Sequence, residues 1–140
     1  MYRLVIATCL FVTVSALGRT QSVGVTGTLM CNDKPAAGVK IKLYDEDKLS
    51  PDEHMATTET DSQGHFLLKG HAEEFTSIEP KFNIYHDCDD GIKPCQRKLT
   101  VYVPDKYISS GEEPKKLFDF GTFQLAGKFE GESRDCLHRL

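Results

Sequence analysis

Hydrophobic and polar residues alternate along most of this chain. In residues 23–31 the apolar side chains of Val23, Val25 and Leu29 fall on odd-numbered positions, and glycine or threonine lies next to each of them. Successive side chains of a β-strand point to opposite faces of a sheet, so this pattern predicts a half-buried strand. The same reasoning predicts seven strands, at residues 23–31, 38–45, 55–60, 66–68, 81–86, 97–103 and 117–125.

Turn residues separate the predicted strands. Residues 32–35 and 61–64 are rich in turn-forming side chains, and Gly64 can adopt a positive φ. The chain shows no long helical period and no internal repeat. Seven short alternating strands in a chain of this length predict one all-β domain, an antiparallel β-sandwich.

The last predicted strand changes phase in its middle. Phe118 and Phe120 fall on one side of the strand, whereas Phe123 and Leu125 fall on the other. Gly121 lies between the two pairs, and a glycine inside a strand often marks a β-bulge. We therefore expect a bulge at Gly121.

Residues 1–18 have the pattern of a secretory signal. Arg3 gives a positive start, residues 4–14 form an apolar core too short to cross a bilayer, and small residues follow. A short membrane anchor or a buried helix is the alternative for this segment. We expect a secreted protein that does not span the membrane, with a sandwich domain at residues 19–127 and a C-terminal tail at 128–140.

Four cysteines remain once Cys9 is removed with the signal segment. An even number in a short secreted chain indicates two disulfides, for which three pairings exist. We expect Cys88–Cys95, because the strands on either side would form a hairpin, and therefore Cys31–Cys136, which would tie the tail to the first strand. Zinc is the alternative, but the spacing contains no C-x-x-C motif, so no metal is expected.

The net charge of the chain and its sequence motifs exclude several classes of function. The formal net charge of −4 argues against nucleic acid as a partner, because domains that bind it are usually basic. The sequence has no phosphate-binding loop or dinucleotide fingerprint, and no serine or cysteine in a recognisable nucleophile setting. We therefore expect no cofactor and no catalytic activity.

A series of short motifs resembles one family of proteins. The motifs are G-x-L-x-C at 27–31, GVKIKLYD at 38–45, TDS-x-G-x-F at 60–66, EP at 79–80, IYHDC at 84–88, CQRK at 95–98, VPD-x-YI at 103–108 and FD-x-G at 118–121. Their order and spacing resemble the nematode transthyretin-like family of secreted proteins. The resemblance implies a transthyretin-like Greek-key sandwich and no established enzymatic activity for most members. One member is described as an extracellular bridge between phosphatidylserine and an engulfment receptor.

The same fold is shared by transthyretin, a carrier of thyroid hormone, and by 5-hydroxyisourate hydrolase. A carrier of a small apolar ligand is therefore an alternative function. The hydrolase relies on a histidine in its first strand and a Tyr-Arg-Gly-Ser terminus. Residues 23–31 contain no histidine, and residues 136–140 read CLHRL, so hydrolysis is not expected.

The resemblance places three of the predicted strands in one sheet with lysine and tyrosine on its outer face. The outward positions are Lys40, Lys42, Tyr44, Lys81, Asn83, Tyr85, Lys98, Thr100 and Tyr102. Lysines near an anionic surface contribute about 1 kcal/mol each, and tyrosines suit interfaces. We expect this face to bind an anionic lipid headgroup or an acidic protein; a solvated face or a homodimer interface are the alternatives.

The loop after residue 85 concentrates charge. His86, Asp87, Asp89 and Asp90 form a candidate receptor-contact loop. Calcium is an alternative ligand for this loop and for the acidic residues of 45–53, and a solvated acidic turn is another. The twelve-residue calcium-binding pattern is not present, so no metal is expected.

Overall fold

The computed structural model describes residues 6–9 and 18–137. The predicted signal segment therefore lies largely outside the described residues, and it stays a prediction. Within the described ranges the chain forms strands, turns and one 3-10 turn, η1 (Asp105–Tyr107). No helix in these ranges has the length and apolar character needed to cross a bilayer.

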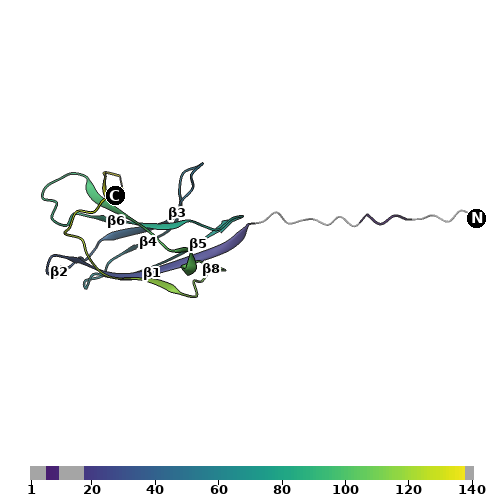
Figure 1. The fold of residues 1–140 in the computed structure, drawn as a ribbon, viewed down its shortest axis with the longest axis horizontal. Helices are drawn as coiled ribbons and strands as arrows, with labels where there is room; N and C mark the ends of the chain where they lie inside the picture. Colours follow the sequence, from purple (N-terminus) through teal and green to yellow (C-terminus); the bar gives the residue numbers. More distant parts are fainter. Residues whose placement is uncertain (1–5, 10–17, 138–140) are drawn as a thin grey trace, which may run out of the picture.

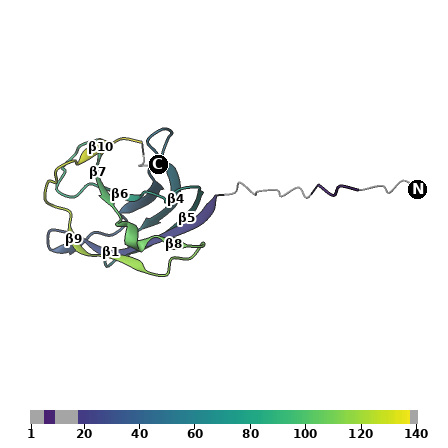
Figure 2. The ribbon, with the colours of Figure 1, turned by 45° about the vertical axis from the view of Figure 1, so that its right-hand side comes forward.

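Two sheets face each other in two layers (Figure 1). The first sheet is built around a long strand, and its members are β1 (Arg19–Cys31), β2 (Lys34–Pro35), β5 (His65–Glu74), β8 (Ser109–Ser110) and β9 (Leu117–Gln124). The second sheet has the order β10 (Ser133–Asp135), β7 (Gln96–Tyr102), β6 (Pro80–His86), β3 (Lys40–Asp45) and β4 (Glu53–Glu59). The turned view separates β9, β1 and β5 from β10, β7 and β6 (Figure 2).

The predicted β-sandwich is confirmed. The seven predicted strands correspond to β1, β3, β4, β5, β6, β7 and β9, and the short strands β2, β8 and β10 were not predicted. One pairing differs from the expected antiparallel arrangement, because β9 runs parallel to β1. The other strand pairs are antiparallel.

The core lies between the two sheets and follows the predicted alternation. Val23 and Leu29 of β1 are fully buried, as are Ile41 of β3 and Phe82 and Ile84 of β6. Burying each side chain of this kind stabilises the fold by about 1.5–3 kcal/mol. Alternation along the strands therefore determines which face of each sheet the core covers.

The expected bulge at Gly121 is confirmed. Asp119 pairs with Thr26 and Thr122 with Thr28, so two residues of β9 lie opposite one residue of β1. Gly121 has a φ of 74°, in the left-handed region that favours glycine. The extra residue compensates the change of phase, so Phe118, Phe120 and Phe123 all pack against the core.

Replacing Gly121 by alanine is expected to lower the free energy of unfolding by about 1 kcal/mol, the cost of a left-handed conformation. A Cβ atom there meets nothing within 4 Å, so conformation rather than a clash causes the loss. Gly127→Ala is the control, because Gly127 does not have a positive φ and a Cβ there meets only ordinary contacts. Urea unfolding measures both variants, and equal stability of the two would contradict the bulge geometry.

All four cysteines of the sandwich and tail form disulfides, but the predicted pairing is wrong. Cys31 bonds to Cys88, and Cys95 bonds to Cys136. Cys88 lies buried just after β6 and faces the end of β1, so its bond joins the two sheets. Cys95 precedes β7, whose outer edge pairs with β10 and so receives the tail. Each bond closes a chain segment of 57 or 41 residues, which stabilises the fold by about 4 kcal/mol in the chain-entropy picture.

Candidate functional site

The second sheet brings the predicted lysine and tyrosine residues together. Strands β3, β6 and β7 are adjacent, and the side chains form three rows across them. The rows are Lys40–Tyr85–Lys98, Lys42–Asn83–Thr100 and Tyr44–Lys81–Tyr102. The predicted residues therefore share one outer face, although their environments differ from row to row.

Acidic residues neutralise the row that ends at Tyr102. Lys81 Nζ lies 2.7 Å from Asp52 Oδ2 and 3.3 Å from Glu46 Oε1. The Tyr102 hydroxyl donates to Glu46 Oε1 at 2.9 Å. Burial alone would lower the pKa of Lys81, but the hydrogen bonds to Asp52 and Glu46 outweigh it and raise that pKa. Lys81 is thus an internally paired cation that holds the loop after β3 against the sheet.

Tyr85 belongs to this face but is buried beneath its neighbours, so it does not offer a contact surface. It is only 1% exposed, contrary to the expectation of an outward, accessible tyrosine. Asn83 Nδ2 donates to its hydroxyl at 3.2 Å, and Lys42 Nζ lies 6.0 Å from its ring centre. Burial raises the pKa of Tyr85, so the phenol stays neutral. The long side chain of Lys42, which lies over the ring, contributes to its burial on an outer face.

The remaining lysines form a cationic end of the face, made of Lys40, Lys42 and Lys98. All three are half-buried; Lys40 and Lys98 flank Tyr85 in one row, and Lys42 lies in the next row. Partial burial and the neighbouring charge of Lys40 lower the pKa of Lys42, whereas Asp135 of β10 acts in the opposite direction. The crowding of like charges favours an anionic partner at this end.

The predicted receptor-contact loop is only partly on the surface. His86 is 3% exposed, and its Nδ1 accepts a hydrogen bond from the Cys88 amide at 3.1 Å. Asp90 is 7% exposed and pairs with Arg134 of the tail. The expectation that these two contact a receptor is therefore wrong, because the C-terminal tail returns and covers them. Asp87 and Asp89 remain exposed.

Arg97 is the centre of a buried polar cluster that the sequence interpretation missed. Its Nε and Nη2 donate to the Glu132 carboxylate at 2.6 and 3.1 Å. Nη1 donates to the carbonyls of Cys88 and Leu125 at 2.7 and 3.1 Å, and Nη2 donates to that of Gly127. The alternation in residues 97–103 places Arg97 on the inward side, so the sequence did indicate that this arginine is buried. No local pattern in the sequence indicates that Glu132 pairs with Arg97.

One group of carboxylates approaches the arrangement of a metal site. Oxygens of Asp45, Glu53 and Glu74 lie within 4.8 Å of one another. Asp45 Oδ1 already accepts the Glu79 amide at 2.8 Å, and burial raises the pKa of Asp45. Calcium takes six to eight oxygen ligands, so three carboxylates, one of them already committed, do not make a calcium site.

The fold and this face define a disulfide-linked β-sandwich with a lysine-bearing outer sheet. The profile of the Transthyretin-like family matches residues 26–104. Transthyretin-like protein 5 of Caenorhabditis elegans is 54% identical over 138 residues, which cover 97% of this chain and 99% of that protein. Transthyretin-like protein 33 of the same organism is 57% identical over 122 residues, 86% of this chain and 85% of that protein. The chain belongs to the Transthyretin-like family, and the resemblance noted in the sequence is confirmed.

A further relative, Transthyretin-like protein 1 of Caenorhabditis elegans, is 41% identical over 140 residues, 94% of this chain and 90% of that protein. None of these three names states an enzymatic activity. A solved 9R-lipoxygenase from Cyanothece PCC8801 overlaps 79% of this chain and 16% of its own, with 20% identity and a TM-score of 0.39. That likeness carries no argument about function.

Proposed function

We propose that this protein is a secreted, non-enzymatic binding protein whose cationic end contacts an anionic cell surface, such as phospholipid headgroups. The observation that carries the proposal is the gathering of Lys40, Lys42 and Lys98 on one sheet face of a chain with a net charge of −4. The two disulfides support an oxidising, extracellular compartment.

The environment of the three lysines supports an electrostatic contact. Lys40 and Lys42 belong to β3 and Lys98 to β7, the two strands that flank β6, so the three lysines share one sheet face. Each lysine near an anionic membrane contributes about 1 kcal/mol, so the three together supply enough for salt-sensitive binding. Tyr102 on the same face is 58% exposed and can add amphipathic contact area.

Two alternatives receive less support. A carrier of an apolar ligand on this face would need an apolar wall, but Tyr85 is buried there, and Lys40 and Lys42 are its neighbours on β3. A homodimer joined by one continuous sheet through β7 would need a free strand edge, and β10 already pairs with Gln96, Arg97 and Lys98 on that edge.

Charge reversal of Lys40, Lys42 and Lys98 to glutamate is expected to weaken binding to phosphatidylserine-containing vesicles by about 100-fold. Co-sedimentation at low and high salt, with phosphatidylcholine vesicles as reference, measures the effect. The control carries the same charge change at Lys106, Lys115 and Lys116, which are exposed and lie outside β3, β6 and β7. Equal losses in both variants, or no binding by the wild type at low salt, would refute the proposal.

A further inference from the structure

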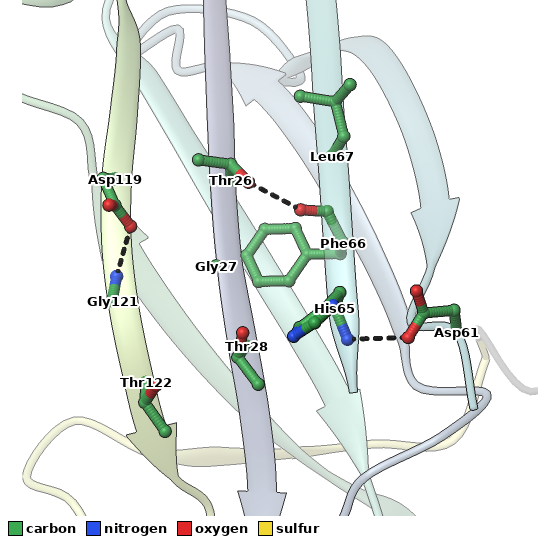
Figure 3. Close-up of a pocket in the computed structure, with 10 residues that line it drawn as sticks. All are labelled: Thr26, Gly27, Thr28, Asp61, His65, Phe66, Leu67, Asp119, Gly121 and Thr122. Atoms are coloured by element: carbon green, nitrogen blue, oxygen red, sulfur yellow. Dashed lines mark hydrogen bonds between the residues drawn. The ribbon is translucent and has the colours of Figure 1, made fainter. Parts of the chain in front are cut away.

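The two outer faces of the sandwich differ in the charges that they carry. The first sheet has a hollow of about 580 Å³ on its outer face, and among the described residues that line it none is lysine or arginine (Figure 3). Its two aspartates, Asp61 and Asp119, lie on opposite sides of β1, and each accepts a backbone amide a few residues further along the chain. This hollow therefore offers an anionic partner no counterpart of the cationic end on the second sheet.

The C-terminal tail brings a carboxylate to the cationic end. In β10, Ser133 pairs with Lys98 and Asp135 pairs with Gln96 across the edge of β7. Residues directly opposite each other in an antiparallel pair point to the same face, and so do residues two positions apart in one strand. Asp135 therefore shares the outer face with Lys98 and is its diagonal neighbour. Diagonal neighbours lie about 7–8 Å apart, within reach of a long side chain.

Bonds on both sides of Asp135 fix its position. Arg134, the residue before it, pairs with Asp90 of the loop after β6. Cys136, the residue after it, is bonded to Cys95 at the start of β7. Asp135 itself is half-buried. A carboxylate that is already held beside a site loses little conformational freedom when it pairs there, so it competes well with an external anion.

The charge of Asp135 acts on the lysines. Lys42 Nζ lies 6.0 Å from the centre of the Tyr85 ring, so the Lys42 side chain reaches from β3 over β6. Burial and the charge of Lys40 lower the pKa of Lys42, whereas Asp135 acts to raise it. Burial raises the pKa of Tyr85, and Asp135 adds to this rise. Glu59 of β4 lies opposite Lys40, but it is exposed, so solvent and salt screen its charge more.

We propose that Asp135 is an internal competitor of the anionic ligand, which pairs with the cationic end until a ligand with several negative charges displaces it. The competition sets a threshold of charge density. A lone anion gains little by replacing one carboxylate, whereas a surface of adjacent anions contacts all three lysines. The inference rests on the proposed function, because it concerns the same lysines.

Replacing Asp135 by asparagine tests the competition, because it removes the charge and keeps the shape of the side chain. The affinity for phosphatidylserine-containing vesicles at low salt is expected to rise about fivefold. The gain should shrink at high salt, where the charges are screened. The matched control is Glu130→Gln, which removes one charge from the same tail at an exposed position outside β10 and should bind as the wild type does.

Two further measurements separate this inference from lipid binding. The pKa of Lys42, followed by side-chain NMR, is expected to fall in Asp135→Asn and to stay unchanged in Glu130→Gln. Pyrophosphate serves as an anion without a lipid, and Asp135→Asn is expected to bind it more tightly than the wild type, measured by the amide shifts of Tyr85 and Lys98.

The inference is overturned if the pKa of Lys42 is the same in Asp135→Asn and in the wild type. It is also overturned if Asp135→Asn binds pyrophosphate no better than Glu130→Gln does. If vesicle binding alone is absent while the Lys42 and pyrophosphate results are as expected, the lipid ligand is refuted and the role of Asp135 is supported.

Discussion

Replacing Arg97 by methionine is expected to lower the free energy of unfolding by about 3–5 kcal/mol. Arg97 is 4% exposed, and its guanidinium donates to the Glu132 carboxylate and to three backbone carbonyls. Methionine fills similar volume but donates no hydrogen bond. The variant therefore leaves Glu132, whose side chain is 12% exposed, as a largely buried charge without its partner.

Urea unfolding followed by circular dichroism measures this loss. The matched control is Lys98→Met, which also replaces a cationic side chain by methionine, one position along β7 but on the outer face. Its expected cost is below about 1 kcal/mol, as for other partly exposed charges. If Arg97→Met proves as stable as Lys98→Met, the cluster does not hold the tail in place.

The stability of the wild-type protein is expected to fall as the pH drops from 6.5 towards 4, because of His86. Burial and the Arg97 charge lower the pKa of His86 from 6.5 to about 4, against the weaker influence of Glu132, Asp87 and Asp90. The folded protein thus favours the neutral imidazole. The stability that the neutral imidazole contributes is fully present above the pKa of His86 in the unfolded chain. This stability is lost as the pH falls from there through the lower pKa of His86 in the folded protein. This difference in pKa corresponds to about 3 kcal/mol.

The structure gives the physical reason for this sensitivity. The neutral His86 ring accepts the Cys88 amide at Nδ1, which a protonated ring cannot do. Its Nε2 has no hydrogen-bond partner, and the nearest anionic oxygen, Glu132 Oε1, lies 3.9 Å away. Protonation would thus place a second buried cation beside Arg97 and remove one hydrogen bond.

Comparing wild type with His86→Gln across this pH range isolates the imidazole from the carboxylates that also titrate. The difference in unfolding free energy between the two should shrink by about 3 kcal/mol on acidification. His65→Gln, the same substitution at an exposed histidine, is the control for the change of side chain itself. A constant difference between wild type and His86→Gln would show that the buried ring does not titrate as expected.

The sequence predicted the strands well because alternation is a local property with a period of two residues. The shift of phase around Gly121 likewise predicted a bulge from neighbouring residues alone. The disulfide pairing failed because it depends on which strand ends meet in space. Cys88 and Cys95 flank one loop, yet Cys88 faces β1 and Cys95 faces the tail.

The sequence predicted which residues of the candidate site share one sheet face, but not the contacts and the burial of their side chains. The family resemblance placed the lysines and tyrosines on one sheet, and β3, β6 and β7 pair accordingly. Whether a lysine is available depends on loops, as the contact of Lys81 with Asp52 shows. The burial of Tyr85 depends on neighbouring side chains from two other strands, which a pattern along one strand cannot reveal.

The Cys31–Cys88 bond has a mechanical consequence. It connects the end of β1 with the segment after β6, and so crosses from one layer of the sandwich to the other. A force that pulls the two outer faces apart at that end would otherwise be resisted by side-chain packing and by the chain segments that cross between the sheets. With the covalent link, the layers cannot be peeled from each other at that end without breaking a sulfur–sulfur bond.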